Sequence, residues 1–492
     1  MALLDAARRV CGGVARRALS SAAAGGGVSS KTDLRLRDAR VVSSKNLGTN
    51  IKPRILVVGS GWGGFTFLGY IDKSKYDVHL LSPSNHFLFT PLLPSSVVGT
   101  LEFRAIQEPV RTVPGLGAYY QAKAVSIDLE SRTVQCRDVF KDQDPFQVEY
   151  DFLVLAAGAK TNTFNTPGIQ EREGEEVFFL KHLYHARQIR NRILECFERA
   201  AIAKSVDPVK RDQLLTFVVV GGGPTNCELV GELNDFITVD VAKWYPDLVS
   251  HIQIHLVERG PRLLGSFDPS ISNYVLNRFI KRNIKVHTGV AVTRFDPETK
   301  VTHLSNGMEI PTGVMVWSAG LAQVKFVQNE PQFTKGPGGR VLVDDHLMVM
   351  NPAADARIFA LGDCAVNTTA PMAPLAQAAA QQAKYLAEEF NRAPPGVGLS
   401  KPAHLMRDGM SKPFKYYSLG SMVTMGQFQG ALDMTQVGDI NKPKNLGFMM
   451  GMLSFFLWRS AYFLKQNSWT NRVLIPLYWF KSFVLGRDIS RF

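Results

Sequence analysis

The sequence predicts an α/β fold with two Rossmann-like nucleotide-binding domains, followed by a C-terminal helical segment that associates with a membrane. Two short apolar strands that each end in a glycine-rich loop, at residues 55–64 and 216–226, predict the two domains. A concentration of apolar, tryptophan and basic residues after residue 446 predicts the membrane-associated segment. The chain of 492 residues is long enough for two or three hydrophobic cores.

The net charge of +13 is concentrated at the two ends of the chain. Residues 1–50 carry nine basic and three acidic side chains, and residues 441–492 carry eight basic side chains and one acidic one. The body between them is therefore neutral. Because it has no basic stripe with interspersed aromatic residues, we do not expect nucleic acid as a partner.

Residues 1–27 are rich in arginine, alanine and serine and contain a single acid, Asp5. This composition is typical of a mitochondrial or plastid transit peptide, and the segment lacks the apolar stretch of a secretory signal. A basic tail without a targeting role is the alternative. Residues 28–52 are predicted to be a polar linker.

The first glycine loop follows the apolar strand at 55–58 and precedes a predicted helix at 65–71 and a second strand at 77–81. In such a unit the glycines allow a tight turn, close approach of the backbone to a pyrophosphate, and close packing of helix on strand. An acid that would bind ribose hydroxyls is expected after the second strand, and Ser82 stands there instead. The ribose contact therefore stays open. The candidate contacts in the loop are Gly59, Gly61, Gly63 and Gly64.

The second glycine loop follows the strand at 216–220, and a later alternating strand at 251–257 ends in Glu258. We expect Glu258 to bind the 2′-hydroxyl of NADH and to repel the 2′-phosphate of NADPH. Asn226 replaces the third glycine of the fingerprint, and we expect it to loosen helix–strand packing or to obstruct the nucleotide. The candidate contacts in this loop are Gly221, Gly222, Gly223, Pro224, Thr225 and Asn226.

The five cysteines contain no C-x-x-C pair, so the sequence carries no signal for a dithiol relay, an iron–sulfur cluster or a structural zinc site. No metal site is predicted. Electrons are therefore expected to travel on organic cofactors.

Further segments resemble the two-dinucleotide flavoprotein superfamily. Residues 150–158 and 313–320 resemble its returning strands, and residues 358–363 resemble its second FAD motif. Within the superfamily, the chain from residue 53 onward resembles the type II NADH dehydrogenases, the alternative NADH:quinone oxidoreductases of mitochondria and bacteria. The most specific segments are residues 87–94, 223–228, 376–381 and 486–492. In the mitochondrial branch a Ser-Pro pair commonly follows the second strand, which matches Ser82 and Pro83.

The resemblance implies glutathione-reductase-like FAD and NADH domains. The FAD domain would comprise residues 53–165 and 331–400, the NADH domain residues 166–330, and a membrane-anchoring or dimerisation region residues 401–492. Asp363 would contact the ribityl–phosphate chain of FAD, while Thr90 and Pro91 would lie near the isoalloxazine ring. Further implied contacts to the two nucleotides are Ala157, Gly158, Ala319, Gly320 and Gly362.

Three polar side chains are candidates for catalysis. Gln377 and Gln381 lie one helical turn apart, so their amides could bind a quinone carbonyl or the flavin edge; alternatively they cap backbone groups in a packing helix. Thr225 and Glu228 have the spacing of a capping box, in which the glutamate ties the helix start. The resemblance places Glu228 near the nicotinamide, where it could orient the ring or relay protons, and both roles can coexist.

Two apolar stretches end the chain. Residues 446–464 are nearly as long as the roughly 20 residues that span a bilayer, but Arg459 interrupts them, and residues 473–485 contain Pro476 and Lys481. Tryptophans beside basic residues favour amphipathic helices that lie in an anionic interface. We expect peripheral attachment to an anionic membrane surface, and a helical pair that forms a homodimer is the alternative.

The sequence thus predicts an enzyme that passes hydride from NADH to FAD and then two electrons to a membrane quinone, ubiquinone in the mitochondrial family. As the family implies, the reaction would be rotenone-insensitive and would not pump protons. One alternative is a sulfide:quinone oxidoreductase, for which only Cys227 and Cys364 could serve as paired cysteines; another is a non-catalytic, flavin-retaining membrane component. The expected location is the mitochondrial inner membrane, on the matrix side because the chain lacks an Asp-rich calcium loop.

Overall fold

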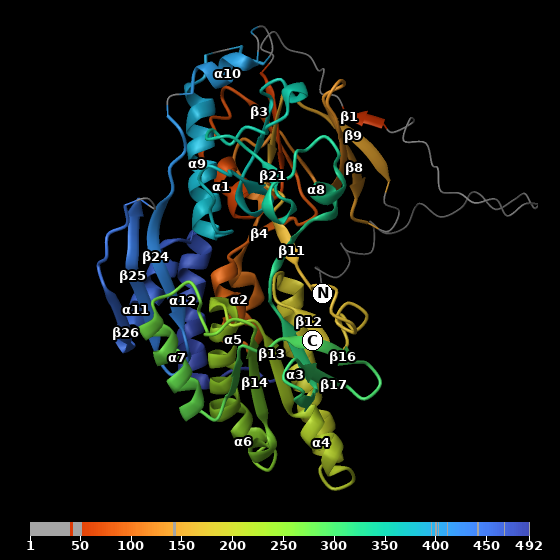
Figure 1. The fold of residues 1–492 in the computed structure, drawn as a ribbon, viewed down its shortest axis with the longest axis vertical. Helices are drawn as coiled ribbons and strands as arrows, with labels where there is room; N and C mark the ends of the chain where they lie inside the picture. Colours follow the sequence, from red (N-terminus) through yellow and green to blue (C-terminus); the bar gives the residue numbers. More distant parts are fainter. Residues whose placement is uncertain are drawn as a thin grey trace, which may run out of the picture. The chain divides into compact units, whose positions relative to one another are not determined.

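The computed structural model describes residues 40–42, 52–140, 144–394, 396–398, 401, 403–410, 412–439, 442–466 and 468–491 (Figure 1). The predicted transit peptide and most of the predicted linker lie outside the described residues. Within that linker, β1 (Arg40–Val42) pairs in parallel with β9 (Pro145–Glu149), so this part of the segment is a strand and not a linker.

The first sheet has five parallel strands in the order β22-β10-β2-β3-β6. Ile55 and Val57 of β2 belong to a core with α1 and α9, while Leu56 and Val58 belong to a core with the antiparallel strands β7, β8 and β9. Figure 1 shows α9 on one side of this sheet and β8 and β9 on the other. Since both faces are covered, the strand reads as a continuous apolar run. The bounds are β2 Arg54–Val58, β3 Asp77–Leu81, β6 Ala118–Tyr120, β7 Ala122–Asp128, β8 Thr133–Asp138, β10 Phe152–Leu155, β22 Ile358–Ala360, α1 Trp62–Tyr70 and α9 Ala376–Arg392.

The second sheet repeats this plan with five parallel strands in the order β12-β19-β13-β14-β15. Phe217 and Val219 of β13 share a core with α3, α5 and α7, and Val218 and Val220 pack with the antiparallel strands β16, β17 and β18. The predicted fold class, with two Rossmann-like units, is confirmed. The bounds are β12 Val177–Phe179, β13 Thr216–Val220, β14 Gln253–Glu258, β15 Lys285–Thr288, β16 Val292–Asp296, β17 Val301–Leu304, β18 Glu309–Pro311, β19 Val314–Trp317, α3 Leu183–Ala203, α5 Pro224–Asp235 and α7 Pro269–Lys281.

A two-stranded antiparallel ribbon of β11 (Ala159–Thr161) and β20 (Leu321–Gln323) connects the two units. Immediately after it, Phe326 and Val327 of α8 (Lys325–Asn329) already pack in the core of the first unit. The chain therefore returns to the first unit a few residues before 330. Shorter elements are β4 His86–Leu88, β5 Gln107–Pro109, β21 Val341–Leu342, β23 Ala365–Val366, α2 Leu93–Val97, α4 Pro208–Leu214, α6 Ala242–Trp244 and α10 His404–Asp408.

The C-terminal region is an antiparallel sheet of β24 (Tyr417–Thr424), β25 (Gly430–Asp439) and β26 (Phe448–Gly451), followed by α11 (Met452–Leu464) and α12 (Trp469–Leu485). The apolar run at 446–464 is thus a strand and a helix, separated where Gly451 adopts a φ of 105°. Among the described helices, none is long and apolar enough to cross a membrane.

The last residues of the chain return to the second unit through Arg487. Its guanidinium group lies 2.9 Å from Asp240 Oδ2 and 3.2 Å from Glu232 Oε2, and its Nε donates to Thr100 Oγ1. The side chains of Arg487, Glu232 and Asp240 are only 12, 12 and 3% exposed. Arg487 therefore joins the end of the chain to α5 and the segment that follows it.

Candidate functional site

The carboxyl ends of the first sheet's strands border a cleft of about 500 Å³ that the second unit also lines. Thr225, Ser318 and Gly320 reach it from the second unit. Parallel sheets bind ligands at this edge, so the site lies where the fold predicts it. The predicted site residues that line the cleft are Gly59, Gly61, Gly63, Ser82, Thr90, Ala157, Gly158, Thr225, Gly320, Gly362 and Asp363.

The glycines of the first loop have different tasks. A Cβ atom on Gly59, which has a φ of 110°, would meet Ala156 O at 2.2 Å, and one on Gly64 would meet Gly59 O at 1.8 Å. A Cβ atom on Gly61, by contrast, would have no neighbour within 4 Å. Gly59 and Gly64 thus allow the turn and the helix–strand contact, while Gly61 leaves the mouth of the cleft open.

α1 begins at this loop with Gly61 as its N-cap residue, which supplies no side-chain cap. The N–H groups of the first helical turn therefore face the cleft without a capping acceptor, an arrangement that suits an anionic group. Ser82, which replaces the expected acid, is 3% exposed and its hydroxyl lies 2.8 Å from Ser60 Oγ. The two hydroxyls occupy the place next to the loop where many related folds carry a carboxylate.

Trp62 positions Thr90, a contact that the sequence did not reveal. The indole N–H donates to Thr90 Oγ1 at 3.0 Å, and the ring packs against Phe87 and Phe89 with centroid distances of 5.1 and 5.2 Å. Thr90 begins a short 3₁₀ turn that includes Pro91, which does not line the cleft. The aromatic cluster therefore holds the Thr90 hydroxyl at the cleft wall.

Lys181 and His182 also line the cleft, and sequence reasoning missed both. They follow β12, so the apolar run Phe178–Leu180 before them could have indicated a strand that ends at the same edge. Burial lowers the pKa of Lys181, and the nearby Asp363 opposes this shift. Burial also lowers the pKa of His182 to about 4, so this ring is neutral at pH 7.

Asn226 ties the second loop to its strand. Its side chain is 2% exposed, and its Nδ2 donates to both Val220 O and Gly221 O at 2.8 Å. These two bonds join the start of α5 to the end of β13 and so argue against looser helix–strand packing, while obstruction of the nucleotide by Asn226 stays a prediction. Gly223 and Pro224 of the same loop are exposed at the start of α5.

Glu258 ends β14 and binds the second loop directly. Its carboxylate accepts hydrogen bonds from the backbone N–H groups of Gly222 and Gly260. The second loop also lies close to the chain that follows β19. A Cβ atom on Gly221 would be 3.4 Å from the Cα atom of Ala319. Glu258 thus fixes the loop in addition to any contact with a nucleotide.

Glu228 does not form the predicted capping box. The N-cap of α5 is Gly223, two residues before Thr225, because Pro224 starts the helix earlier. Instead, Glu228 Oε1 accepts from the backbone N–H of Thr424 at 3.3 Å and from Trp458 Nε1 at 3.1 Å. Burial raises the pKa of Glu228 well above 4.5. This carboxyl therefore joins α5 to the C-terminal region.

We expect Glu228→Gln to weaken the pH dependence of stability. With a raised pKa in the folded state, Glu228 contributes stability that is complete below its unfolded pKa of 4.5 and is lost as pH rises through the folded value. Glutamine keeps the accepting oxygen and cannot ionise. Denaturant midpoints of the variant should exceed those of the wild type at alkaline pH and converge with them at acid pH; parallel curves would contradict this assignment.

Gln377 and Gln381 bind the backbone of β24. Gln381 accepts from Tyr417 N–H at 3.0 Å and donates to Tyr417 O at 2.7 Å. Gln377 accepts from Leu419 N–H at 3.1 Å and donates to Gly420 O at 3.2 Å. In this structure the two amides thus cap backbone groups, as the second of the two interpretations predicts. Neither residue lines the cleft.

The four cysteines in the described part of the chain are free and buried. Burial raises the pKa of Cys364 to about 11 and raises that of Cys227 further. Thiols of this kind are poor nucleophiles at neutral pH, which disfavours a mechanism with paired reactive cysteines. Among the same residues, no group of histidine, cysteine or acidic side chains could hold a metal ion.

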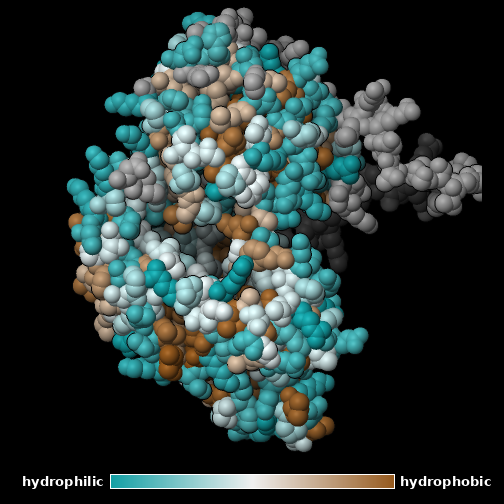
Figure 2. All heavy atoms as spheres, viewed as in Figure 1, coloured by the Kyte–Doolittle hydropathy of each residue, from teal (hydrophilic) through white to brown (hydrophobic). Residues whose placement is uncertain are grey.

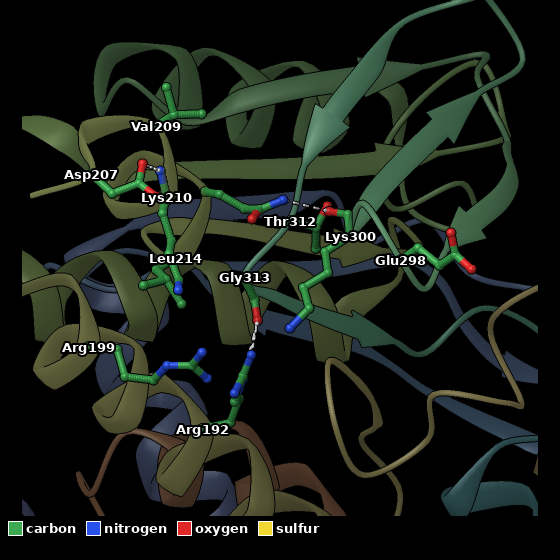
Figure 3. A pocket seen from close by; sticks show the side chains of 11 residues that line it. Arg192, Arg199, Asp207, Val209, Lys210, Leu214, Glu298, Lys300, Thr312 and Gly313 are labelled. Carbon is green, nitrogen blue, oxygen red and sulfur yellow. Dashed lines mark hydrogen bonds between the residues drawn. The ribbon is translucent and has the colours of Figure 1, made fainter. Parts of the chain in front are cut away.

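A different cavity, of about 380 Å³, lies at the opposite edge of the second sheet (Figure 3). There Arg192 donates to Gly313 O at 3.3 Å, immediately before β19. Lys300, which also lines the cavity, binds the buried Glu176 next to β12 at 2.7 Å. These charged groups hold the amino ends of two strands, and the cavity contains none of the predicted site residues.

Two family models cover most of the chain. Residues 53–383 match the pyridine nucleotide-disulphide oxidoreductases, and residues 420–488 match the NDH2 C-terminal domain. The chain belongs to the type II NADH dehydrogenase (NDH2) family. The resemblance inferred from the sequence motifs is therefore confirmed.

Relatives of this NDH2 chain extend over nearly its whole length. A probable NADH dehydrogenase of Dictyostelium discoideum is 39% identical, over 89% of this chain and 91% of the relative. The internal alternative NAD(P)H-ubiquinone oxidoreductase A1 of Arabidopsis thaliana is 38% identical, over 89% and 86%. The external NADH-ubiquinone oxidoreductase 2 of Saccharomyces cerevisiae is 34% identical, over 89% and 82%. Internal and external mitochondrial NDH2 enzymes are thus both similar to this chain.

Among solved structures, NDH2 of Plasmodium falciparum in complex with NADH superimposes with a TM-score of 0.79, at 26% identity over 89% of this chain and 100% of that one. The sulfide:quinone oxidoreductase of Aquifex aeolicus has a TM-score of 0.61 at 18% identity, over 89% and 96%, and shares the fold. The NDH2 fold therefore accounts for the two sheets and the C-terminal region together.

Proposed function

We propose that this chain is a respiratory NADH:quinone oxidoreductase that holds FAD on the first glycine loop, binds NADH on the second, and passes two electrons to ubiquinone without pumping protons. One observation carries the proposal: the two glycine-loop units contribute residues to a single cleft. A nicotinamide held by the second unit can then meet a flavin held by the first. When bound, FAD accepts a hydride and releases electrons in a separate step.

The first unit has the features that FAD requires. The uncapped start of α1 faces the cleft and suits a pyrophosphate, and Gly61 leaves room for close approach. Asp363 offers a carboxylate to hydroxyl groups, and the hydroxyl of Thr90 is held in place by Trp62. Lys181 adds a positive charge in the same cleft, suited to a cofactor that becomes more negative on reduction.

The second unit supports NADH as the electron donor. Its helix α5 also starts without a side-chain cap, at Gly223, and Thr225 of its first turn reaches the shared cleft. Glu258 lies at the end of the neighbouring strand, where the ribose of a dinucleotide binds in this fold. Its negative charge favours a free 2′-hydroxyl over a 2′-phosphate.

We expect Glu258→Gln to raise the NADPH/NADH ratio of kcat/KM by about tenfold, which corresponds to about 1.4 kcal/mol. The substitution removes the repulsion of the 2′-phosphate. The single amide oxygen of glutamine can accept from Gly222 or from Gly260 but not from both, so the ratio is read together with kcat/KM for NADH, which reports any change in the loop. Steady-state kinetics with both nucleotides would measure the ratio, and an unchanged ratio would exclude Glu258 as the determinant.

Anaerobic stopped-flow absorbance tests the reaction itself. NADH should bleach the bound flavin, and subsequent mixing with a ubiquinone analogue should restore its colour. Bleaching by sulfide instead would indicate a sulfide:quinone oxidoreductase, which the buried Cys227 and Cys364 disfavour. A flavin that neither donor bleaches would indicate a non-catalytic membrane component.

The C-terminal helices support peripheral membrane attachment. Their inner faces, with Trp458, Ile475 and Trp479, pack in the core of the second unit, whereas their outer faces are apolar and exposed. Figure 2 shows brown and tan surface at the left edge, where Figure 1 places β25 and β26 of the C-terminal sheet. Exposed apolar patches of this kind bind membranes or other proteins. The exposed residues are Met452, Leu453, Phe456, Leu457, Leu464, Trp469, Val473, Leu477, Phe480, Phe483, Val484 and Leu485.

We expect Leu477→Glu combined with Phe480→Glu to reduce flotation with liposomes at least about tenfold, since each side chain contributes on the order of 1.5–3 kcal/mol when buried. Both residues are more than half exposed, so folding should be unaffected. The matched control is Ile202→Glu on α3, which is 75% exposed. Unchanged flotation would contradict membrane attachment through this face. If the variant dissociates from a homodimer into monomers while flotation is unchanged, the face is a dimer interface.

The location proposed for the protein is the matrix side of the mitochondrial inner membrane. Relatives named as internal and as external mitochondrial enzymes are both similar to this chain. Protease protection in isolated mitochondria and in mitoplasts would separate the two sides. Digestion in mitoplasts, whose outer membrane is open and whose inner membrane is closed, would place the enzyme on the intermembrane side.

A further inference from the structure

A small basic pocket lies where the C-terminal end of α7 meets the turn between β24 and β25. It has a volume of about 250 Å³. Arg278 and Arg282 join it to the turn, because they donate to Gln429 Oε1 and Met425 O. The residues that line it are Asn234, Thr238, Arg278, Lys281, Arg282 and Gln427.

Arg282 is the most informative of these residues. Its side chain is 7% exposed, and its Nη2 is buried without a hydrogen-bond acceptor in the described part of the chain. The neighbouring Asp235 accepts from the backbone N–H of Gln427 through Oδ2, and its Oδ1, which lies 3.8 Å from Arg282 Nη1, is also buried without a hydrogen-bond partner among the described residues. A buried guanidinium donor without an acceptor costs on the order of 1–3 kcal/mol. An anion in the pocket would supply the missing acceptor.

The charge of the pocket favours an anion of the phosphate type. Three cations line it, and Asp235 is the acid in contact with Arg282. Burial raises the pKa of Asp235 to about 6, so this carboxylate is still largely ionised at pH 7 and neutralises one of the three cations. Asn234 and Thr238 add polar groups from α5 and the segment after it. Guanidinium and ammonium groups together bind phosphate oxygens well.

The pocket is continuous with the apolar face of α11 and α12. Phe428, the neighbour of Gln427, is 39% exposed, and its ring contacts Phe455 of α11 and Phe483 of α12 at centroid distances of 5.4 and 5.9 Å. On α7, Ile280 is 58% exposed beside Lys281. A ligand with a phosphate in the pocket and hydrocarbon on this face would use both surfaces.

We propose that the pocket binds the phosphate of an anionic phospholipid, whose acyl chains lie against the exposed face of α11 and α12. This inference rests on the proposed membrane attachment and deepens it, because it assigns one lipid class to one site. The pocket and the apolar face would then contact the bilayer at two neighbouring places. Together they would fix the orientation of the protein on the membrane surface.

The test compares the full-length holoenzyme on phosphatidylcholine vesicles with and without phosphatidylglycerol. The wild type should bind the anionic vesicles more tightly. Lys281→Gln, at an exposed position, should reduce this preference about fivefold, since each basic residue near the surface contributes on the order of 1 kcal/mol. Lys210→Gln on α4, a basic residue outside the pocket, is the control and should leave the preference unchanged.

A second variant separates the pocket from general surface charge. Arg282→Lys keeps the charge but loses the planar donors. A specific site therefore predicts a reduced preference for anionic vesicles, whereas diffuse electrostatics predict an unchanged preference. If Arg282→Lys and Lys281→Gln both retain the wild-type preference, the proposal is wrong. Thermal stabilisation of the wild type by inorganic phosphate, without any preference for anionic vesicles, would instead assign the pocket to free phosphate and overturn the lipid proposal.

The outcomes distinguish this inference from the proposed function. Binding to phosphatidylcholine with no preference for the anionic lipid contradicts the pocket and leaves membrane attachment intact. Failure to bind any vesicle contradicts both. Flavin bleaching by NADH should be the same in all variants, because none of these residues lines the cleft.

Discussion

Gly64→Ala should give a protein that retains little flavin. The new Cβ atom would lie 1.8 Å from Gly59 O, so the loop and α1 must separate by about 1 Å or more. Both partners are backbone, and no side chain can move to relieve the clash. Because this loop forms the wall of the cleft, we expect the affinity for FAD to fall at least about tenfold. The flavin absorbance per protein after purification measures the effect.

Gly69→Ala is the matched control for this experiment. It lies on the same helix, and a Cβ atom there has no neighbour within 4 Å. Alanine also favours a helix over glycine by about 1 kcal/mol, so this variant should retain flavin and be slightly more stable. Equal flavin content in Gly64→Ala and Gly69→Ala would show that the close contact at Gly64 is not needed.

Arg487→Ala should lower the free energy of unfolding by about 3–5 kcal/mol. The substitution leaves the carboxylates of Glu232 and Asp240 buried without the cation that they share. It also removes the bond to Thr100, while Asp488 keeps its contact with Arg190 and Arg491 keeps its contact with Glu195. Chemical denaturation followed by tryptophan fluorescence reports this directly, since Trp458 and Trp479 lie in the affected region.

Arg491→Ala provides the comparison for Arg487. Its side chain is 58% exposed and lies 3.7 Å from Glu195, a surface pair that is worth about 1 kcal/mol or less. The two variants remove the same charge from the same segment. Similar losses of stability would mean that overall charge, and not the buried network, holds the end of the chain.

The nucleotide-binding units could be predicted closely from the sequence. The strands at 77–81 and 216–220 have the expected bounds. At 216–220 a largely apolar run ends at Gly221, and at 77–81 the apolar residues Val78, Leu80 and Leu81 precede Ser82 and Pro83. The contact of Asp363 with the same cleft as Gly59 also agrees with its motif. These features are local, so a short stretch of sequence carries them.

The contacts that the sequence did not reveal are long-range. Glu228 has the spacing of a capping box, yet its partners lie about 200 residues away in β24 and α11. Lys181 reaches the cleft only because β12 pairs with β19, far along the chain. Asn226 looked like a defect because the fingerprint counts glycines, whereas its amide makes two backbone hydrogen bonds that the fingerprint does not describe.

The paired bonds from Gln377 and Gln381 to β24 have a thermodynamic consequence. The first turn of α9 borders the cleft through Ala376 and Ala379, and the first two turns are bonded through Gln377 and Gln381 to the sheet that precedes α11 and α12. A ligand that orders this turn also orders the sheet, and by linkage the effect is reciprocal. Loading of the cofactor and residence on the bilayer should therefore reinforce each other by the same free energy, so that a chain without flavin leaves the membrane more readily.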